Sequence, residues 1–97
     1  MSDFSLILPN DFDEYAWEVE AKGWFSDVMV NVAGKAYKLN FYDPARLNKE
    51  IEDDLSRNVA FVGGNLVVVR SVNRANIEIA VSDLVRSERI YSLASEQ

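Results

Sequence analysis

The 97-residue sequence contains no cysteine and no histidine. Without cysteine, the chain forms no disulfide and offers no thiolate as a nucleophile or metal ligand. Without histidine, it lacks the usual general base at neutral pH and the commonest zinc ligand. Because disulfides belong mainly to oxidising compartments, the absence of cysteine also leads us to expect a cytoplasmic protein.

Long apolar runs are absent as well, and none reaches the length needed to cross a lipid bilayer. The start of the chain, Met1–Phe4, has neither the basic residue nor the apolar region of a signal peptide. We find no internal repeat, linker or low-complexity segment. A hydrophobic fraction of 48% argues against disorder. We therefore predict a single folded domain over residues 1–97.

Acidic residues outnumber basic ones, and their distribution along the chain is uneven. The net charge is −6. Residues 1–54 contain twelve acids and five bases, or −7, whereas residues 55–97 contain four acids and five bases, or +1. Such a domain repels nucleic acids and anionic membranes, and it attracts a basic partner. The alternative is that the charge only keeps a small protein soluble.

Catalytic and metal-binding patterns are present only in incomplete form. The glycine-rich segment Gly63–Asn65 lacks the Lys-Ser or Lys-Thr that follows in a phosphate-binding loop. The acidic turn Asp11–Glu14 lacks the glycine and the distant glutamate of a calcium loop. Glu18 and Glu20 are expected on a strand face exposed to water, which is unsuited to a catalytic acid–base pair. We therefore expect no enzyme, no cofactor and no metal site.

An abrupt change from strand to helix is the clearest local feature. Apolar and polar residues alternate over Lys35–Phe41, which indicates a half-buried strand. Asp43 and Pro44 are suited to the N-cap and the first position of a helix. Apolar residues at every fourth position then predict a helix over Pro44–Arg57. Its apolar stripe consists of Leu47, Ile51 and Leu55.

Alternating patterns predict three more strands before this junction. They are Phe4–Leu8, Tyr15–Glu20 and Trp24–Val32. Ala33 and Gly34 are expected to form a tight turn into the next strand, because glycine accepts a positive φ. The first half of the chain is therefore predicted to be an antiparallel β-meander.

Two strands and a helix are predicted in the second half. Val59–Val62 resembles a short strand, and the unbroken apolar run Leu66–Val69 indicates a strand inside the sheet rather than at its edge. Asn73 is suited to cap a helix whose apolar positions follow helical spacing. These positions are Ile77, Ala80, Val81, Leu84 and Val85. The final segment, Ser87–Gln97, is either a frayed tail or a docked segment.

The expected fold class is α+β, with a meander followed by a helix, a buried strand and a C-terminal helix. Both helices are expected to pack on one sheet face, which leaves the opposite face open or covered by something else. Four aromatic residues lie on the early strands: Tyr15, Trp17, Trp24 and Phe25. We expect most of them in the core, and any that face outward would form an interface patch.

Two short segments carry a resemblance to a known group of proteins. They are Phe41–Leu47 (FYDPARL) and Asn65–Val69 (NLVVV), the second being followed by the helix that begins at Asn73. In these segments and in its short, acidic format, the chain is similar to bacterial immunity proteins of contact-dependent inhibition and polymorphic toxin systems. The resemblance implies a protein that binds and neutralises a cognate toxin. It transfers no particular binding residues to this chain.

These observations together predict a non-catalytic protein-binding module, most simply an immunity protein for a basic, nuclease-type toxin. Five acids would steer the partner: Asp11, Asp13, Glu14, Glu18 and Glu20. Two aromatic residues, Trp17 and Trp24, would anchor it. The alternative is an accessory or assembly protein that forms a homo-oligomer through its open sheet face or an edge strand.

Overall fold

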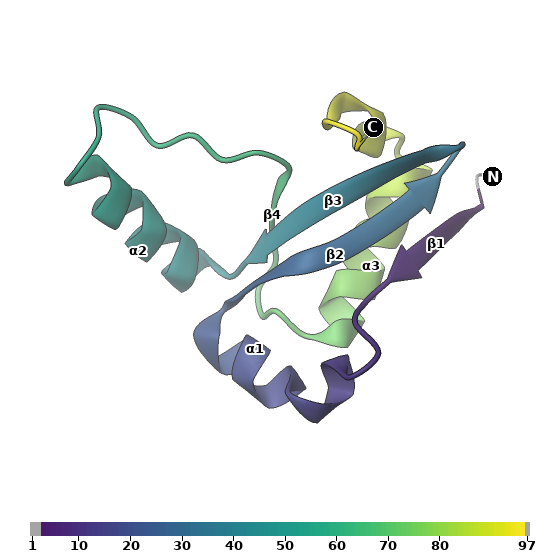
Figure 1. Ribbon diagram of the computed structural model, residues 1–97, viewed down its shortest axis with the longest axis horizontal. Helices are drawn as coiled ribbons and strands as arrows, with labels where there is room; N and C mark the ends of the chain where they lie inside the picture. The colour runs from purple at the N-terminus through teal and green to yellow at the C-terminus, as the bar shows by residue number, and fades with distance from the viewer. Residues whose placement is uncertain (1–2, 97) are drawn as a thin grey trace.

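A four-stranded sheet with the strand order β1-β2-β3-β4 forms the centre of the structure, a computed structural model that describes residues 3–96 (Figure 1). Met1, Ser2 and Gln97 lie outside the described residues, and so do the predictions made for the start of the chain, Met1–Phe4, and for the final segment, Ser87–Gln97, as far as they concern these three residues. The elements are β1 (Phe4–Ile7), the 3-10 helix η1 (Phe12–Glu14), α1 (Ala16–Lys22), β2 (Trp24–Val32), β3 (Lys35–Tyr42), α2 (Pro44–Leu55), β4 (Leu66–Val68), α3 (Arg74–Arg86) and the 3-10 helix η2 (Arg89–Ser92). The α+β class is confirmed. Within residues 3–96, no helix is both long and apolar enough to cross a membrane.

The antiparallel meander is confirmed for β1, β2 and β3. Val30 pairs with Leu6 on one side and with Tyr37 on the other. Ala33 and Gly34 connect β2 to β3 with φ angles of 53° and 76°. Two consecutive positive φ angles give a turn whose twist matches that of the strands, which is why the second position is a glycine.

The predicted strand Tyr15–Glu20 is wrong, because this stretch forms the start of α1. Burial follows helical spacing: Val19 is buried, Tyr15 four residues earlier is half-buried, and Trp17 between them is 69% exposed. The segment is rich in alanine, glutamate and lysine, which favour helix. Gly23 ends the helix in the left-handed region (φ 73°), with its N–H bonded to the carbonyl of Val19 at 2.9 Å.

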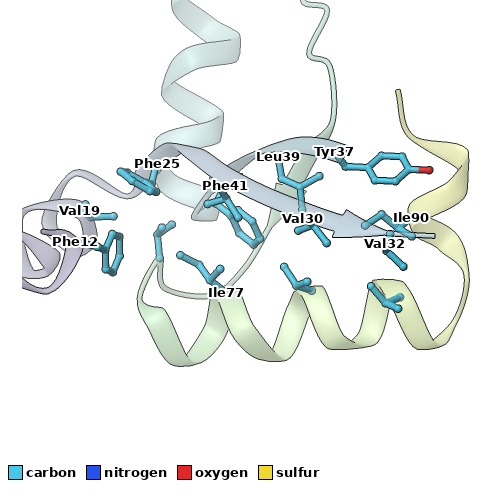
Figure 2. Close-up of a cluster of buried hydrophobic side chains, with 14 residues drawn as sticks. Phe12, Val19, Phe25, Val30, Val32, Tyr37, Leu39, Phe41, Ile77 and Ile90 are labelled. Atoms are coloured by element: carbon cyan, nitrogen blue, oxygen red, sulfur yellow. The ribbon is translucent and has the colours of Figure 1, made fainter. Parts of the chain in front are cut away.

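The hydrophobic core lies between the sheet and α3 (Figure 2). Ile77 and Val81 are buried on α3 as predicted, and Val85 is buried with them, whereas Leu84 is only partly buried against the same core. Asn73 caps the helix by accepting a hydrogen bond from the backbone N–H of Asn76 at 2.9 Å. The sheet contributes its inward-facing side chains: Val28, Val30, Val32, Tyr37, Leu39 and Phe41.

The strand-to-helix junction is confirmed, but the helix takes a different direction from the expected one. Asp43 Oδ1 accepts a hydrogen bond from the backbone N–H of Arg46 at 2.7 Å, and Pro44 is the first helical residue. Instead of covering the sheet, α2 projects from its end (Figure 1). None of its residues is buried, and Leu55 is 47% exposed. With only Asp43 between β3 and α2, the chain has no loop with which to turn back across the sheet.

The expected position of the Leu66–Val69 strand inside the sheet is also wrong, because β4 is an edge strand parallel to β3. Its residues are half-buried or exposed, since α3 covers one face and the other face remains open. The long return from α2 over residues 56–65 brings the chain back in the parallel direction. Val59–Val62 is not a strand, and Val59 and Val62 are exposed to solvent.

The C-terminal segment is docked onto the body of the protein. Ile90 in η2 is fully buried. The side chain of Asn65 accepts a hydrogen bond from the backbone N–H of Ala94 at 2.9 Å and donates one to its carbonyl at 2.7 Å. Ala36 and Glu96 form an isolated antiparallel bridge. These contacts hold the segment at the end of the sheet that carries the β2–β3 hairpin.

Candidate protein-binding surface

One end of the molecule holds most of its net charge. We call residues 11–27, which form η1, α1 and the start of β2, the acidic end (Figure 1). This segment contains six acids and one base, so it contributes −5 to the net charge of −6. The acids are Asp11, Asp13, Glu14, Glu18, Glu20 and Asp27. Such a concentration produces a local negative field that a uniform distribution would not give.

A small aromatic cluster fixes the acidic end to the core. The fully buried ring of Phe12 meets Tyr15 and Phe25 edge-on, with ring centroids 5.8 and 5.1 Å apart. Edge-to-face contacts of this kind stabilise aromatic pairs beyond their burial alone. The Arg74 guanidinium lies over the Phe12 ring, 5.4 Å from its centroid. The acids are therefore carried on a well-anchored surface.

Two of the predicted binding acids take part in contacts with α3. Asp13 pairs with Arg74, with 3.0 Å between the carboxylate and Nε. Glu20 accepts a hydrogen bond from the Asn73 side chain at 2.9 Å. By contrast, Asp11, Glu14 and Glu18 are exposed and form no ion pair with any residue in 3–96. These three acids remain free to act on a partner.

A hollow of about 290 Å³ lies between α1 and the start of β2. It brings together two of the predicted site residues, Glu18 and Trp24. Its walls carry both charge signs and aromatic rings: Tyr15, Glu18, Val19, Lys22, Trp24, Phe25, Ser26 and Asp27. Asp27, which the sequence reasoning did not single out, faces this hollow with Glu18. With two acids and one base, Lys22, the lining carries a net negative charge, which suits a basic side chain.

Tyr15 at this hollow has its pKa raised above the ordinary value of 10.0, mainly by burial and then by the negative charges of Asp11 and Asp27. We expect Asp27→Asn to lower the pKa of Tyr15 in a titration followed by phenolate absorbance, with Tyr15→Phe identifying its signal. Because the pKa of Tyr15 is higher in the folded state than in the unfolded state, its neutral hydroxyl contributes to the stability of the fold below pH 10.0. This contribution is lost as the pH rises through the folded-state pKa. A Tyr15 pKa below 10.0 would contradict this geometry.

The two tryptophans face different surroundings. Trp17 projects from α1 on the side opposite to Val19 and does not line the hollow. Trp24 is 36% exposed, and the Arg46 guanidinium lies 5.7 Å from the centroid of its ring. The expectation that most of the four early aromatic residues lie in the core is wrong, because among them Phe25 alone is buried and Tyr15 is half-buried. The two candidate anchors are thus exposed, as an interface requires.

Sequence reasoning missed a second exposed apolar surface, on the projecting segment 44–65. We call this segment the α2 arm. Its apolar stripe was detected by spacing but was assigned to the core, because spacing gives the apolar face of a helix and not what covers it. Leu55, Val59 and Val62 are exposed on this arm. Nothing in the local pattern around Val59 and Val62 indicates exposure.

No group of three or more acidic side chains among the described residues is placed to hold a metal ion. Comparison of the chain with protein-family models, with curated proteins and with solved structures finds no match.

Proposed function

We propose that this chain is a non-catalytic, cytoplasmic protein-binding module that acts as an immunity protein, binding and neutralising a basic, nuclease-type bacterial toxin. The observation that carries the proposal is the acidic end, where −5 of the net charge is gathered around exposed aromatic residues. A basic surface is its natural electrostatic complement. The segments similar to immunity proteins, FYDPARL and NLVVV, support the same function.

The acidic end carries residues suited to both steps of binding, the encounter with the partner and the formation of close contacts. Asp11, Glu14 and Glu18 are unpaired and exposed, so their field can speed the encounter with a positively charged partner. Trp17, with its exposed ring, then offers a large apolar contact of the kind that dominates binding energy. A lysine or arginine of the partner fits the hollow, where Glu18 and Asp27 face it. Bound there, the module would cover the basic surface with which a nuclease holds its substrate.

The second candidate is an accessory or assembly protein that forms a homo-oligomer through the open sheet face. It is favoured by a row of apolar side chains across three strands on that face. In this row Trp24 pairs with Tyr42, and Tyr42 pairs with Val68. Val68 is exposed and lies on the edge strand, so the row continues to the border of the sheet.

The first candidate predicts a toxin domain encoded beside the gene of this chain, and that domain is the partner with which it is tested. We expect co-expression to rescue growth and surface plasmon resonance to show binding whose association rate falls with added salt. The double variant Glu14→Lys/Glu18→Lys should slow association by about tenfold or more and change dissociation little, because exposed charges act mainly on the encounter. Trp17→Ala should instead raise the dissociation rate, since it removes an anchor.

A matched control is available at the opposite end of the sheet. Asp3→Lys/Glu96→Lys changes the net charge by the same amount, but Asp3 precedes the Phe4–Val32 pair and Glu96 pairs with Ala36. This control should associate at nearly the wild-type rate. Equal slowing by both double variants, or association that is insensitive to salt, would contradict a role for the acidic end. Absence of a toxin gene beside this one would contradict the immunity function itself.

A further inference from the structure

The α2 arm lacks the contacts that normally stabilise a helix of its length. Isolated helices shorter than about 12–15 residues are marginal in water and depend on packing of their apolar face. The α2 helix has 12 residues, and none of them is buried. Its described support is mostly local, namely the Asp43 cap, Pro44 and the ion pair between Arg46 and Glu50 at 2.7 Å, and to this is added the Arg46 guanidinium 5.7 Å from the centroid of the Trp24 ring. The apolar stripe is thus only partly covered, since Leu47 and Ile51 are half-buried and Leu55 is exposed.

The area and shape of the molecule show how much surface is uncovered. The accessible area is 6355 Å², whereas a compact monomer of 11.0 kDa is expected to expose about 5,600 Å². The excess of about 750 Å² is close to the roughly 800 Å² that each partner contributes to a standard interface. The radius of gyration of 13.8 Å likewise exceeds the roughly 12.5 Å expected for this length. Figure 1 places the projection at α2 and the chain that follows it.

We infer that the α2 arm is a self-association surface, on which α2 packs antiparallel against α2 of a second copy of this chain. The apolar stripe is symmetric about its middle residue, Ile51, with Leu47 and Leu55 each four residues away. Around a two-fold axis at Ile51, Leu47 of one copy faces Leu55 of the other. The same patch therefore serves both partners, as a two-fold interface requires.

The charge distribution along α2 favours a second copy in this orientation. Its first half carries Arg46 and Lys49, and its second half carries Glu50, which pairs with Arg46, and three acids that form no ion pair within residues 3–96, Glu52, Asp53 and Asp54. The last turn holds no basic residue, so the acids lie where the helix dipole of their own helix disfavours them. In an antiparallel pair, the acidic half of each helix lies beside the basic half and the positive dipole end of the other. The unfavourable interaction between these acids and the dipole of their own helix is thus offset in the dimer and not in the monomer.

A single cysteine gives a direct geometric test, because the natural chain has none. Ile51→Cys places a thiol next to the proposed two-fold axis, within reach of its symmetry mate. We expect this variant to form a disulfide-linked dimer under mild oxidation. Ile79→Cys is the matched control, since Ile79 is exposed by 67% on α3 and lies away from the arm. Equal cross-linking of both variants, or of neither, overturns the inference.

Sedimentation of the full chain measures the association itself. We expect dimers of two 11.0 kDa chains with a Kd of about 1–10 µM. Leu55→Asp should weaken dimerisation at least about tenfold, because it places an unpaired carboxylate in the seam, whereas Ile79→Asp should not weaken it. A chain that stays monomeric up to about 100 µM overturns self-association. This holds even if Leu55→Asp weakens toxin binding.

This inference stands apart from the proposed immunity function, because it rests on α2 and not on the acidic end. Dimerisation without toxin binding would support self-association through α2 and contradict the immunity function. Toxin binding by a persistent monomer would do the reverse.

Discussion

Replacing Phe12 with alanine should destabilise the protein by about 3–5 kcal/mol, a large part of the 5–15 kcal/mol that holds a typical domain folded. Phe12 is fully buried and makes edge-on contacts with Tyr15 and Phe25, and Arg74 lies over its ring. Its removal leaves a cavity where η1 and α1 join the core. Chemical denaturation measures the loss as a lower midpoint with a similar slope.

Trp17→Ala is the control for this prediction. It removes a larger aromatic ring from the same end of the protein, but Trp17 is exposed to solvent. We expect its unfolding free energy to stay within about 0.5 kcal/mol of the wild type, the usual range for exposed sites. A Phe12→Ala protein as stable as Trp17→Ala would show that the aromatic cluster does not anchor the acidic end.

The second large effect is expected for Gly23→Ala, which should cost about 2–4 kcal/mol. Gly23 has φ 73°, a conformation that costs an alanine about 1–2 kcal/mol. A Cβ at this position would also lie 2.6 Å from Cγ of Asp43 and in contact with both carboxylate oxygens. Because this carboxylate caps α2, its displacement costs about 1 kcal/mol more. Thermal or chemical unfolding gives the total.

Gly34→Ala separates the two contributions. Gly34 has a similar φ of 76°, and nothing lies within 4 Å of an added Cβ. It should therefore show only the backbone cost. The clash is tested independently in the double variant Gly23→Ala/Asp43→Ala, whose loss should be less than the sum of the two single losses. Equal destabilisation by Gly23→Ala and Gly34→Ala would mean that the carboxylate moves aside freely.

Local patterns were sufficient wherever neighbouring residues in the chain decide the conformation. The Asp43–Pro44 and Asn73 helix starts depend on a side chain that reaches an amide three residues away. The β2–β3 hairpin depends on two turn residues and alternating strands. The α1 segment failed this test because six residues of alternating polarity resemble a strand, while their composition favours helix. There the i, i+4 pair Tyr15 and Val19, together with Gly23, was the informative signal.

The candidate site was predictable only in part. Composition placed the negative charge in the first half of the chain, and the structure concentrates it in residues 11–27. The sequence offers no means of knowing that Asp13 and Glu20 would be engaged by Arg74 and Asn73, which lie more than fifty residues away along the chain. Asp27 joins the site only because α1 and β2 enclose a common hollow.

By itself, the sequence determined the fold class, the hairpin, the two long helices and the acidic character of the molecule, because these depend on short-range hydrogen bonding, hydrophobic period and composition. Tertiary structure alone decided that β4 lies at the sheet edge and that α2 projects from the sheet. Both outcomes depend on where the chain returns after a junction, and thus on long-range packing. An apolar stripe indicates that one face of a helix is suited to burial. Only the tertiary structure shows whether other parts of the same chain pack against that face.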